Sequence, residues 1–219
     1  MLKRSNEMRR LILTTILLAN SIIFSQSYTL TEDYEIITEK LGDLDNDGID
    51  EKVIVINTKD STENGFIREI QILKLSKNTW VEWKKSRNAI LKSDEGGMMG
   101  DPFEGIEIKN NVLLISHFGG SSWKWGNVDK YRFQNNQFEL IGHTSNYGKL
   151  CEYWANFDFN ISTGKIAYKK EFEDCDNNQT IYKTEKEVFL KKGLKINLNN
   201  RFLNEIKIIS PNLKVALYL

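Results

Sequence analysis

Residues 106–118, IEIKNNVLLISHF, decide the fold of this sequence, because an Asn-Asn pair separates two runs rich in β-branched and other apolar residues. Asn tolerates positive φ better than most residues, so such a pair suits the tight turn of a β-hairpin. The same arrangement returns at 130–144, KYRFQNNQFELIGHT. Two such hairpins predict an antiparallel sheet in this part of the chain.

Outward from these hairpins, further segments show period-2 alternation or β-branched and aromatic enrichment. They are residues 51–58, 68–75, 153–160, 164–172 and 180–190. Helical patterns are scarce: 81–93, VEWKKSRNAILKS, is the best candidate, 197–210 is ambiguous, and 213–219 indicates a late strand or a short docking segment. We therefore expect an all-β, mainly antiparallel fold, a meander that forms a sandwich or a curved open sheet, with few short helices.

The N-terminus has the features of a signal peptide. Four basic residues lie within the first ten positions, an apolar stretch covers 11–24, and Ser25 and Ser27 offer a cleavage site. The apolar stretch is shorter than the roughly 20 residues of a membrane-spanning helix. We expect residues 1–27 to be removed and 28–219 to form a single β-rich domain, secreted or periplasmic and without a stable membrane anchor.

Charge limits the class of partner. Removal of residues 1–27 leaves 26 Lys and Arg residues against 29 Asp and Glu residues. A nucleic-acid partner calls for a basic surface, so this balance argues against one. The expected partner is a molecule of the cell surface or the extracellular space.

The two cysteines, Cys151 and Cys175, both lie in the part expected to be exported. An oxidising compartment favours a disulfide between them, which would close a loop of roughly 25 residues. Free thiols are the next alternative. A zinc site lacks the four ligands it needs, and a catalytic cysteine needs a histidine partner that the sequence does not place nearby.

A calcium loop is the strongest candidate site. In residues 42–56, GDLDNDGIDEKVIVI, Asp43, Asp45 and Asp47 alternate, and a glycine then permits a sharp turn. The carbonyl of Ile49 and the carboxylate of Glu51 follow at the next ligand positions. The twelfth position of an EF-hand would be a Glu but here is Ile54, so a helix–loop–helix site is excluded. An Asx-turn without an ion remains the alternative.

This loop, followed at once by an alternating apolar strand, resembles the calcium hairpin of integrin-type FG-GAP and VCBS-like repeats. The resemblance covers about 20 residues and implies that Asp43, Asp45, Asp47, Ile49 (through its carbonyl) and Glu51 bind calcium. Glu51 departs from the more common Asp but still donates oxygen. A looser resemblance is to small exported proteins of the Bacteroidetes group. It rests on the signal peptide, the hairpin and residues 96–125, 131–145 and 160–165, and it implies no activity.

Two other segments are candidate sites. Trp123 and Trp125, in HFGGSSWKWGN at 117–127, fall on one face of a strand, where they either stack on a sugar or peptide or pack in the core. The Gly-rich acidic stretch 94–105, DEGGMMGDPFEG, is expected to be a surface loop. The alternatives are a ligand-binding loop and the catalytic carboxylates of a small hydrolase.

The sequence thus predicts a calcium-binding, non-enzymatic interaction or structural module. The alternatives are a carbohydrate-binding module that uses Trp123 and Trp125, and a small hydrolase that uses carboxylates of 94–107.

Overall fold

The structure is a computed structural model that describes residues 34–176 and 180–219. Its regular elements are strands, arranged in three antiparallel sheets, and neither described range contains a helix. The four-stranded sheet consists of β1 (Glu35–Gly42), β2 (Glu51–Ser61), β3 (Phe66–Ser76) and β4 (Thr79–Ser86). The seven-stranded sheet consists of β5 (Phe103–Lys109), β6 (Val112–Gly120), β7 (Lys124–Gln134), β8 (Gln137–Lys149), β9 (Tyr153–Asn160), β10 (Lys165–Asp174) and β11 (Thr180–Leu190). The third sheet is the hairpin of β12 (Lys207–Ile209) and β13 (Ala216–Tyr218).

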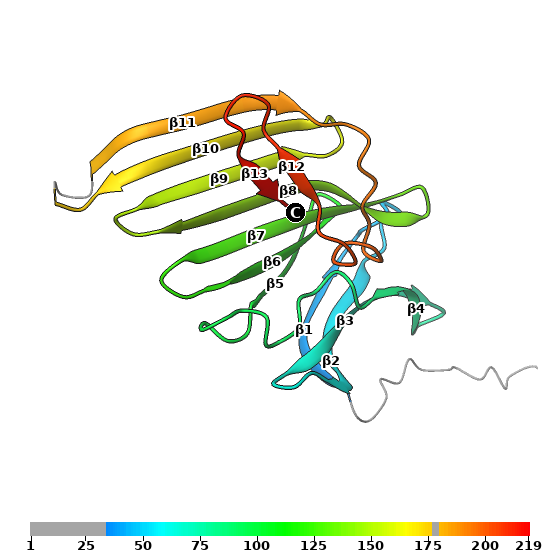
Figure 1. Cartoon of the computed structure of the whole chain (residues 1–219). Helices are drawn as coiled ribbons and strands as arrows, with labels where there is room; N and C mark the ends of the chain where they lie inside the picture. The colour runs from blue at the N-terminus through cyan, green and yellow to red at the C-terminus, as the bar shows by residue number, and fades with distance from the viewer. Residues whose placement is uncertain (1–33, 177–179) are drawn as a thin grey trace, which may run out of the picture.

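Both larger sheets are meanders, because every strand pairs with its neighbour in sequence. The seven-stranded sheet is open, and the four-stranded sheet lies against its β5 end (Figure 1). The predicted all-β antiparallel meander is confirmed. The predicted helix over 81–93 is wrong: its first half belongs to β4, which pairs with β3. The rest is a loop, and its Ala89 and Ile90 are buried in the core. The apolar residues of this segment are therefore buried without forming a helix.

The Asn-Asn pairs form the hairpin turns. Asn110 and Asn111 have φ of 49° and 60°, and Asn135 and Asn136 have φ of 51° and 60°. The flanking residues pair directly, Lys109 with Val112 and Gln134 with Gln137. Two consecutive residues at positive φ define the two-residue turn whose twist matches that of the strands.

The main core lies between the two larger sheets. Alternate residues of β2 and β3, Val53, Val55, Ile70 and Ile72, pack with alternate residues of β5–β8. The latter include Ile106, Leu113, Ile115, Tyr131, Phe138 and Leu140. Because side chains alternate across a strand, this core uses one face of each sheet.

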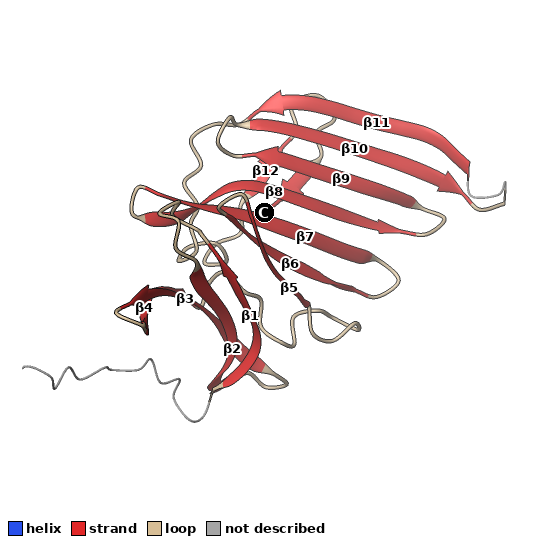
Figure 2. Ribbon diagram, turned by 180° about the vertical axis from the view of Figure 1, so that it is seen from behind, coloured by secondary structure: helices blue, strands red, loops and turns tan. Residues whose placement is uncertain are grey.

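The C-terminal segment covers the next part of the same face of the large sheet. Ile208 and Leu217, from β12 and β13, pack on Phe157, Phe159 and other residues of β9 and β10. Figure 1 shows this hairpin lying across the face, and in the view from behind no described strand crosses β8–β11 (Figure 2). The large sheet is therefore covered by described strands on one face.

A buried ion pair fixes the start of the C-terminal segment. Asp129 of β7 is 0% exposed and Arg201 is 1% exposed. Arg201 donates from Nε to Asp129 Oδ2 at 2.5 Å and from Nη2 to Oδ1 at 3.4 Å. The Arg201 and His143 contacts hold the pKa of Asp129 well below its usual range, against the opposing effect of burial.

The predicted disulfide is confirmed. Cys151 and Cys175 are bonded, with 5.1 Å between their Cα atoms, and join the turn after β8 to the turn after β10. This bond is compatible with an oxidising compartment. No helix in the described ranges is long and apolar enough to span a membrane. The predicted signal peptide at 1–27 lies outside the described residues.

Candidate metal centre

The predicted calcium loop connects β1 to β2 and is held by its own carboxylates. Asp43 accepts hydrogen bonds from the backbone N–H groups of Asn46 at 2.6 Å and Gly48 at 3.0 Å. Asn46 and Gly48 have positive φ, of 65° and 84°, which tightens the turn. Asp47 accepts from the N–H of Ile49 at 2.8 Å. These are the local hydrogen bonds that Asp favours in turns.

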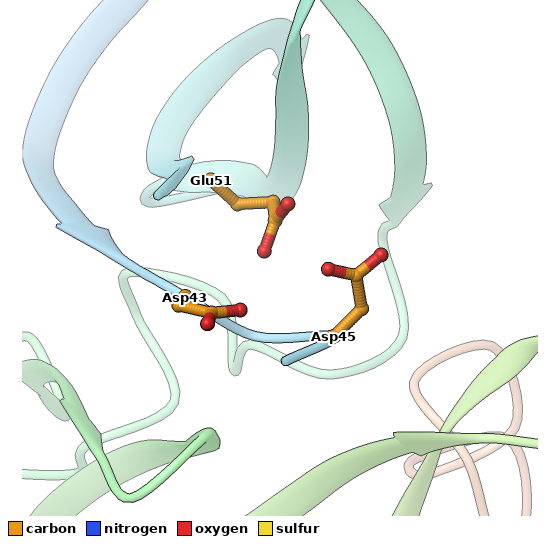
Figure 3. A group of neighbouring side chains, drawn as sticks. All are labelled: Asp43, Asp45 and Glu51. Atoms are coloured by element: carbon orange, nitrogen blue, oxygen red, sulfur yellow. The ribbon is translucent and has the colours of Figure 1, made fainter. Parts of the chain in front are cut away.

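The loop brings three carboxylates together. One oxygen from each of Asp43, Asp45 and Glu51 lies within 4.8 Å of the others (Figure 3). Glu51 is 1% exposed and accepts a hydrogen bond from the N–H of Leu44 at 2.7 Å. Burial raises the pKa of Glu51, and that hydrogen bond partly offsets the effect. Within residues 34–176 and 180–219, this is the one group of three potential metal ligands.

The other two predicted ligands lie differently. Asp47 is not part of the group of three, since its Oδ1 accepts from Ile49 and its Oδ2 lies 3.2 Å from Lys74 Nζ. The Ile49 N–H and Lys74 hold the pKa of Asp47 below its usual range. Ile49 is 51% exposed on the same loop. Ligation by Asp47 and by the Ile49 carbonyl stays a prediction.

Lys74 of β3 is the functional residue that the sequence analysis missed. Its ammonium contacts Asp45 most closely and lies 3.2 Å from Asp47 Oδ2 and 3.4 Å from Glu51 Oε1. Burial opposes its charge, but hydrogen bonds to Asp45 and Asp47 outweigh burial and raise the pKa of Lys74 above its usual range. The signal was available: Lys74 falls at the same alternation as the buried Ile70 and Ile72, where a strand usually presents an apolar residue.

Lys74 therefore neutralises part of the acidic cluster with a monovalent cation. One acceptor stays free even so, because Asp45 Oδ1 is buried without a hydrogen-bond partner among the described residues. The ammonium also lies 4.5 Å from the centroid of the Trp83 ring. The site is thus a set of carboxylate oxygens around the ammonium of Lys74.

The loop is placed at the junction of the two larger sheets. Leu44, between two of the acidic residues, is buried in the main core. Asn111, in the β5–β6 turn, donates to the backbone carbonyl of Asp43 at 2.8 Å. A Cβ on Gly42 would lie 2.7 Å from Cγ2 of Ile108 of β5, so the Ile108 side chain packs directly on the Gly42 backbone. A cation bound at this loop would act on the contact between the sheets.

Comparison with protein-family models, with curated proteins and with solved structures gives no match to this chain. The resemblance to FG-GAP and VCBS-like repeats stays a prediction.

The other predicted segments take separate positions. Trp123 and Trp125 are both half-buried; Trp125 lies at the start of β7, and Trp123 directly precedes this strand. In the acidic stretch, Asp94 accepts from Thr62 at 2.5 Å, Glu95 pairs with Lys92 at 3.3 Å, and Asp101 pairs with Arg68. Each of these three carboxylates has its own partner, and the Arg68 contact is one of those that keep the pKa of Asp101 low against burial.

Proposed function

We propose that this chain is a calcium-binding β-protein that acts, outside the cytoplasm, as a non-enzymatic interaction or structural module. The observation that carries the proposal is the convergence of Asp43, Asp45 and Glu51 within 4.8 Å on a loop anchored between two sheets. Ca²⁺ takes six to eight oxygen ligands, which carboxylates and backbone carbonyls of a tight loop supply. The disulfide is compatible with the oxidising, calcium-rich surroundings in which weak calcium sites are filled.

Calcium would replace the Lys74 ammonium rather than join it. A divalent cation and an ammonium repel each other, and both need Asp45 and Glu51. Departure of Lys74 also frees Asp47, which the resemblance includes among the ligands. The loop would thus exchange an internal cation for an external one, and calcium would stabilise the junction of the sheets because it binds the folded chain only.

The test is calcium titration of the purified chain by calorimetry, together with thermal melts in calcium and in chelator. At a calcium concentration 100 times Kd, binding adds about 2.7 kcal/mol to the free energy of unfolding. For a chain of this size, that raises the melting temperature by roughly 5–10 °C. Asp45→Asn should abolish the effect, whereas Asp50→Asn, in the same loop but outside the cluster, should retain it.

A second variant separates the two cations. Lys74→Gln removes the competing charge, so we expect it to melt lower than wild type in chelator and to gain more from calcium. Lys77→Gln, on the exposed β3–β4 turn, is the matched control and should behave as wild type. Absence of a heat of binding and of a melting shift, in wild type and in Lys74→Gln at about 10 mM calcium, rejects the proposal and leaves Lys74 as the permanent counter-ion.

A further inference from the structure

A cavity of about 550 Å³ lies on the large sheet, away from the acidic loop. Its walls are the faces of β7–β10 and the C-terminal residues Val215–Leu219, which form part of the hairpin that crosses the sheet in Figure 1. The volume is within the roughly 300–1,000 Å³ of small-molecule sites. Seven aromatic rings contribute to the wall, those of Trp125, Tyr147, Tyr153, Phe157, Tyr168, Phe202 and Tyr218.

Two buried polar side chains line the cavity beside these rings. His143 and Arg201 are 2% and 1% exposed. Asp129, which does not line the cavity, binds His143 Nδ1 at 2.6 Å and the Nε/Nη2 edge of Arg201. Each side chain therefore turns its other edge away from Asp129. The nitrogens on those edges, His143 Nε2 and Arg201 Nη1, have no hydrogen-bond partner among the described residues.

The hydrogen-bonding character of these two nitrogens indicates which chemical group of a ligand would suit them. A carboxylate only accepts hydrogen bonds, so the His143 Nδ1 facing Asp129 carries a proton, and in the neutral tautomer of the ring Nε2 is an acceptor. Arg201 Nη1 is a donor. A hydroxyl suits an acceptor and a donor alike, because it can both donate and accept. An anion is disfavoured, since Asp129 already neutralises the charge of Arg201.

A row of aromatic rings continues from the cavity across the sheet. Trp123 stacks on Tyr147 with 5.3 Å between ring centroids and an angle of 11°. Trp123 also contacts Tyr153, which contacts Phe172, which contacts Tyr182. Tyr147 and Tyr182 are 44% and 65% exposed, so the row reaches solvent. Such a row matches a ligand with several flat, apolar faces in succession.

Charged groups along the row are largely balanced. Lys149, which lies 5.7 Å from the Trp123 ring centroid, pairs with Glu152 at 3.3 Å. Lys183, near the Phe172 ring, pairs with Glu185 at 2.6 Å. Lys170 lies 3.6 Å from the Tyr153 ring centroid. These pairs offer hydrogen-bond donors and acceptors to hydroxyls without the excess positive charge that a polyanion requires.

We propose that the cavity and this aromatic row bind an uncharged glycan chain, with one sugar in the cavity and the following sugars stacked on the row. Sugar rings combine flat C–H faces, which pack on aromatic rings, with hydroxyls that donate and accept. The proposal concerns a different sheet and different residues from the calcium site, and it goes beyond calcium binding.

The experiment is a titration of the whole chain with neutral tetrasaccharides of glucose, N-acetylglucosamine, xylose and mannose, in chelator and in calcium. Tryptophan fluorescence follows the five tryptophans, of which Trp125 lines the cavity, and calorimetry gives Kd. We expect at least one neutral tetrasaccharide to bind, and the β1–β2 loop variant Asp45→Asn to bind it equally well. Tetragalacturonate, of similar size but charged, should bind at least about tenfold more weakly.

Two variants and one control test the location. Trp125→Leu and Tyr153→Leu each remove a ring but keep an apolar side chain, and each should weaken binding by about tenfold or more. Trp80→Leu, on β4 of the four-stranded sheet, should change Kd less than about twofold. Thermal melts confirm that each variant is folded. The proposal is overturned if none of the neutral tetrasaccharides binds at about 10 mM, or if tetragalacturonate binds most tightly. It is also overturned if Trp125→Leu and Tyr153→Leu both fold and both bind the sugar as tightly as wild type.

Discussion

Buried polar side chains connect segments that are far apart in the sequence. His117 of β6 illustrates this, because it is 2% exposed and both ring nitrogens are engaged. Its Nε2 accepts from the N–H of Leu91 at 3.2 Å, and its Nδ1 lies 3.3 Å from Asn127 Oδ1. Burial lowers the pKa of His117 to about 4, and the nearby Arg201 and Arg68 add to this effect.

This pKa predicts acid sensitivity in a defined range. The folded pKa of about 4 lies below the ordinary value of 6.5, so the unfolded chain binds the proton first as pH falls. Above pH 6.5 the neutral His117 does not reduce the free energy of unfolding. Between pH 6.5 and about 4 the free energy of unfolding falls, by about 3 kcal/mol in total, because only the unfolded chain binds the proton. Urea unfolding across this range should show the loss.

The matched variant is His117→Gln, whose amide can accept from Leu91 and donate to Asn127 without titrating. It should flatten the pH dependence of the free energy of unfolding between pH 6.5 and 4. Equal slopes in wild type and in His117→Gln would show that other groups cause the acid sensitivity.

At the scale of elements, hairpin turns and central strands were predictable because their signals are local. Residues 153–160 and 180–190 coincide with β9 and β11. β1 was not predicted, because its residues are mostly exposed or half-buried and show no apolar alternation. Its place depends on hydrogen bonds to β2, which no local pattern reveals. The misassigned start of 81–93 has the same cause, since β4 is an edge strand held by β3.

The β7–β8 turn gives a test of backbone conformation. Asn136 has φ of 60°, where a β-branched residue is strained by about 1–2 kcal/mol. Asn136→Val should lower the free energy of unfolding by that amount, and Asn136→Gly should leave it within about 0.5 kcal/mol of wild type. Urea denaturation measures both. Similar stability of the Val and Gly variants would contradict the role of positive φ.

The disulfide makes a second prediction at this scale. Cys151 and Cys175 are 24 residues apart, and such a closed loop stabilises a folded chain by about 3 kcal/mol. The double variant Cys151→Ser, Cys175→Ser should unfold at correspondingly lower urea concentration. Reductant should lower the stability of wild type toward that of the variant and leave the variant unchanged. A wild type insensitive to full reduction would show that the loop is held by strand pairing alone.

At the scale of the whole molecule, long-range contacts set the limit of what the sequence predicted. Asp43, Asp45 and Glu51 were predicted because one short loop carries all three. Lys74 comes from another strand, 29 residues from Asp45. The cavity needs Val215–Leu219 to lie on β7–β10. Local periodicity marks Lys74 as a charge at an apolar position of β3 but does not say that it meets the β1–β2 loop. It contains no information about the docking that forms the cavity.

The calcium proposal makes a prediction about the whole molecule. Because the loop contacts the β5–β6 turn through Asn111, calcium should slow amide hydrogen exchange on both sides of the sheet junction. We expect protection in residues 42–53 and 105–115 and little change in β9–β11, as measured by mass spectrometry. Asn111→Ala should confine the protection to the first range. Uniform protection across the chain would indicate that calcium acts on global stability instead.

The meander has a consequence for the order in which the molecule is built during synthesis. Within each of the two larger sheets, every strand after the first pairs with the strand that precedes it, so pairing can follow emergence of the chain, hairpin by hairpin. The exception is the final segment, which must fold back over strands completed long before. Residues of this segment line the cavity. The cavity proposed for the glycan would therefore form only after both larger sheets are in place.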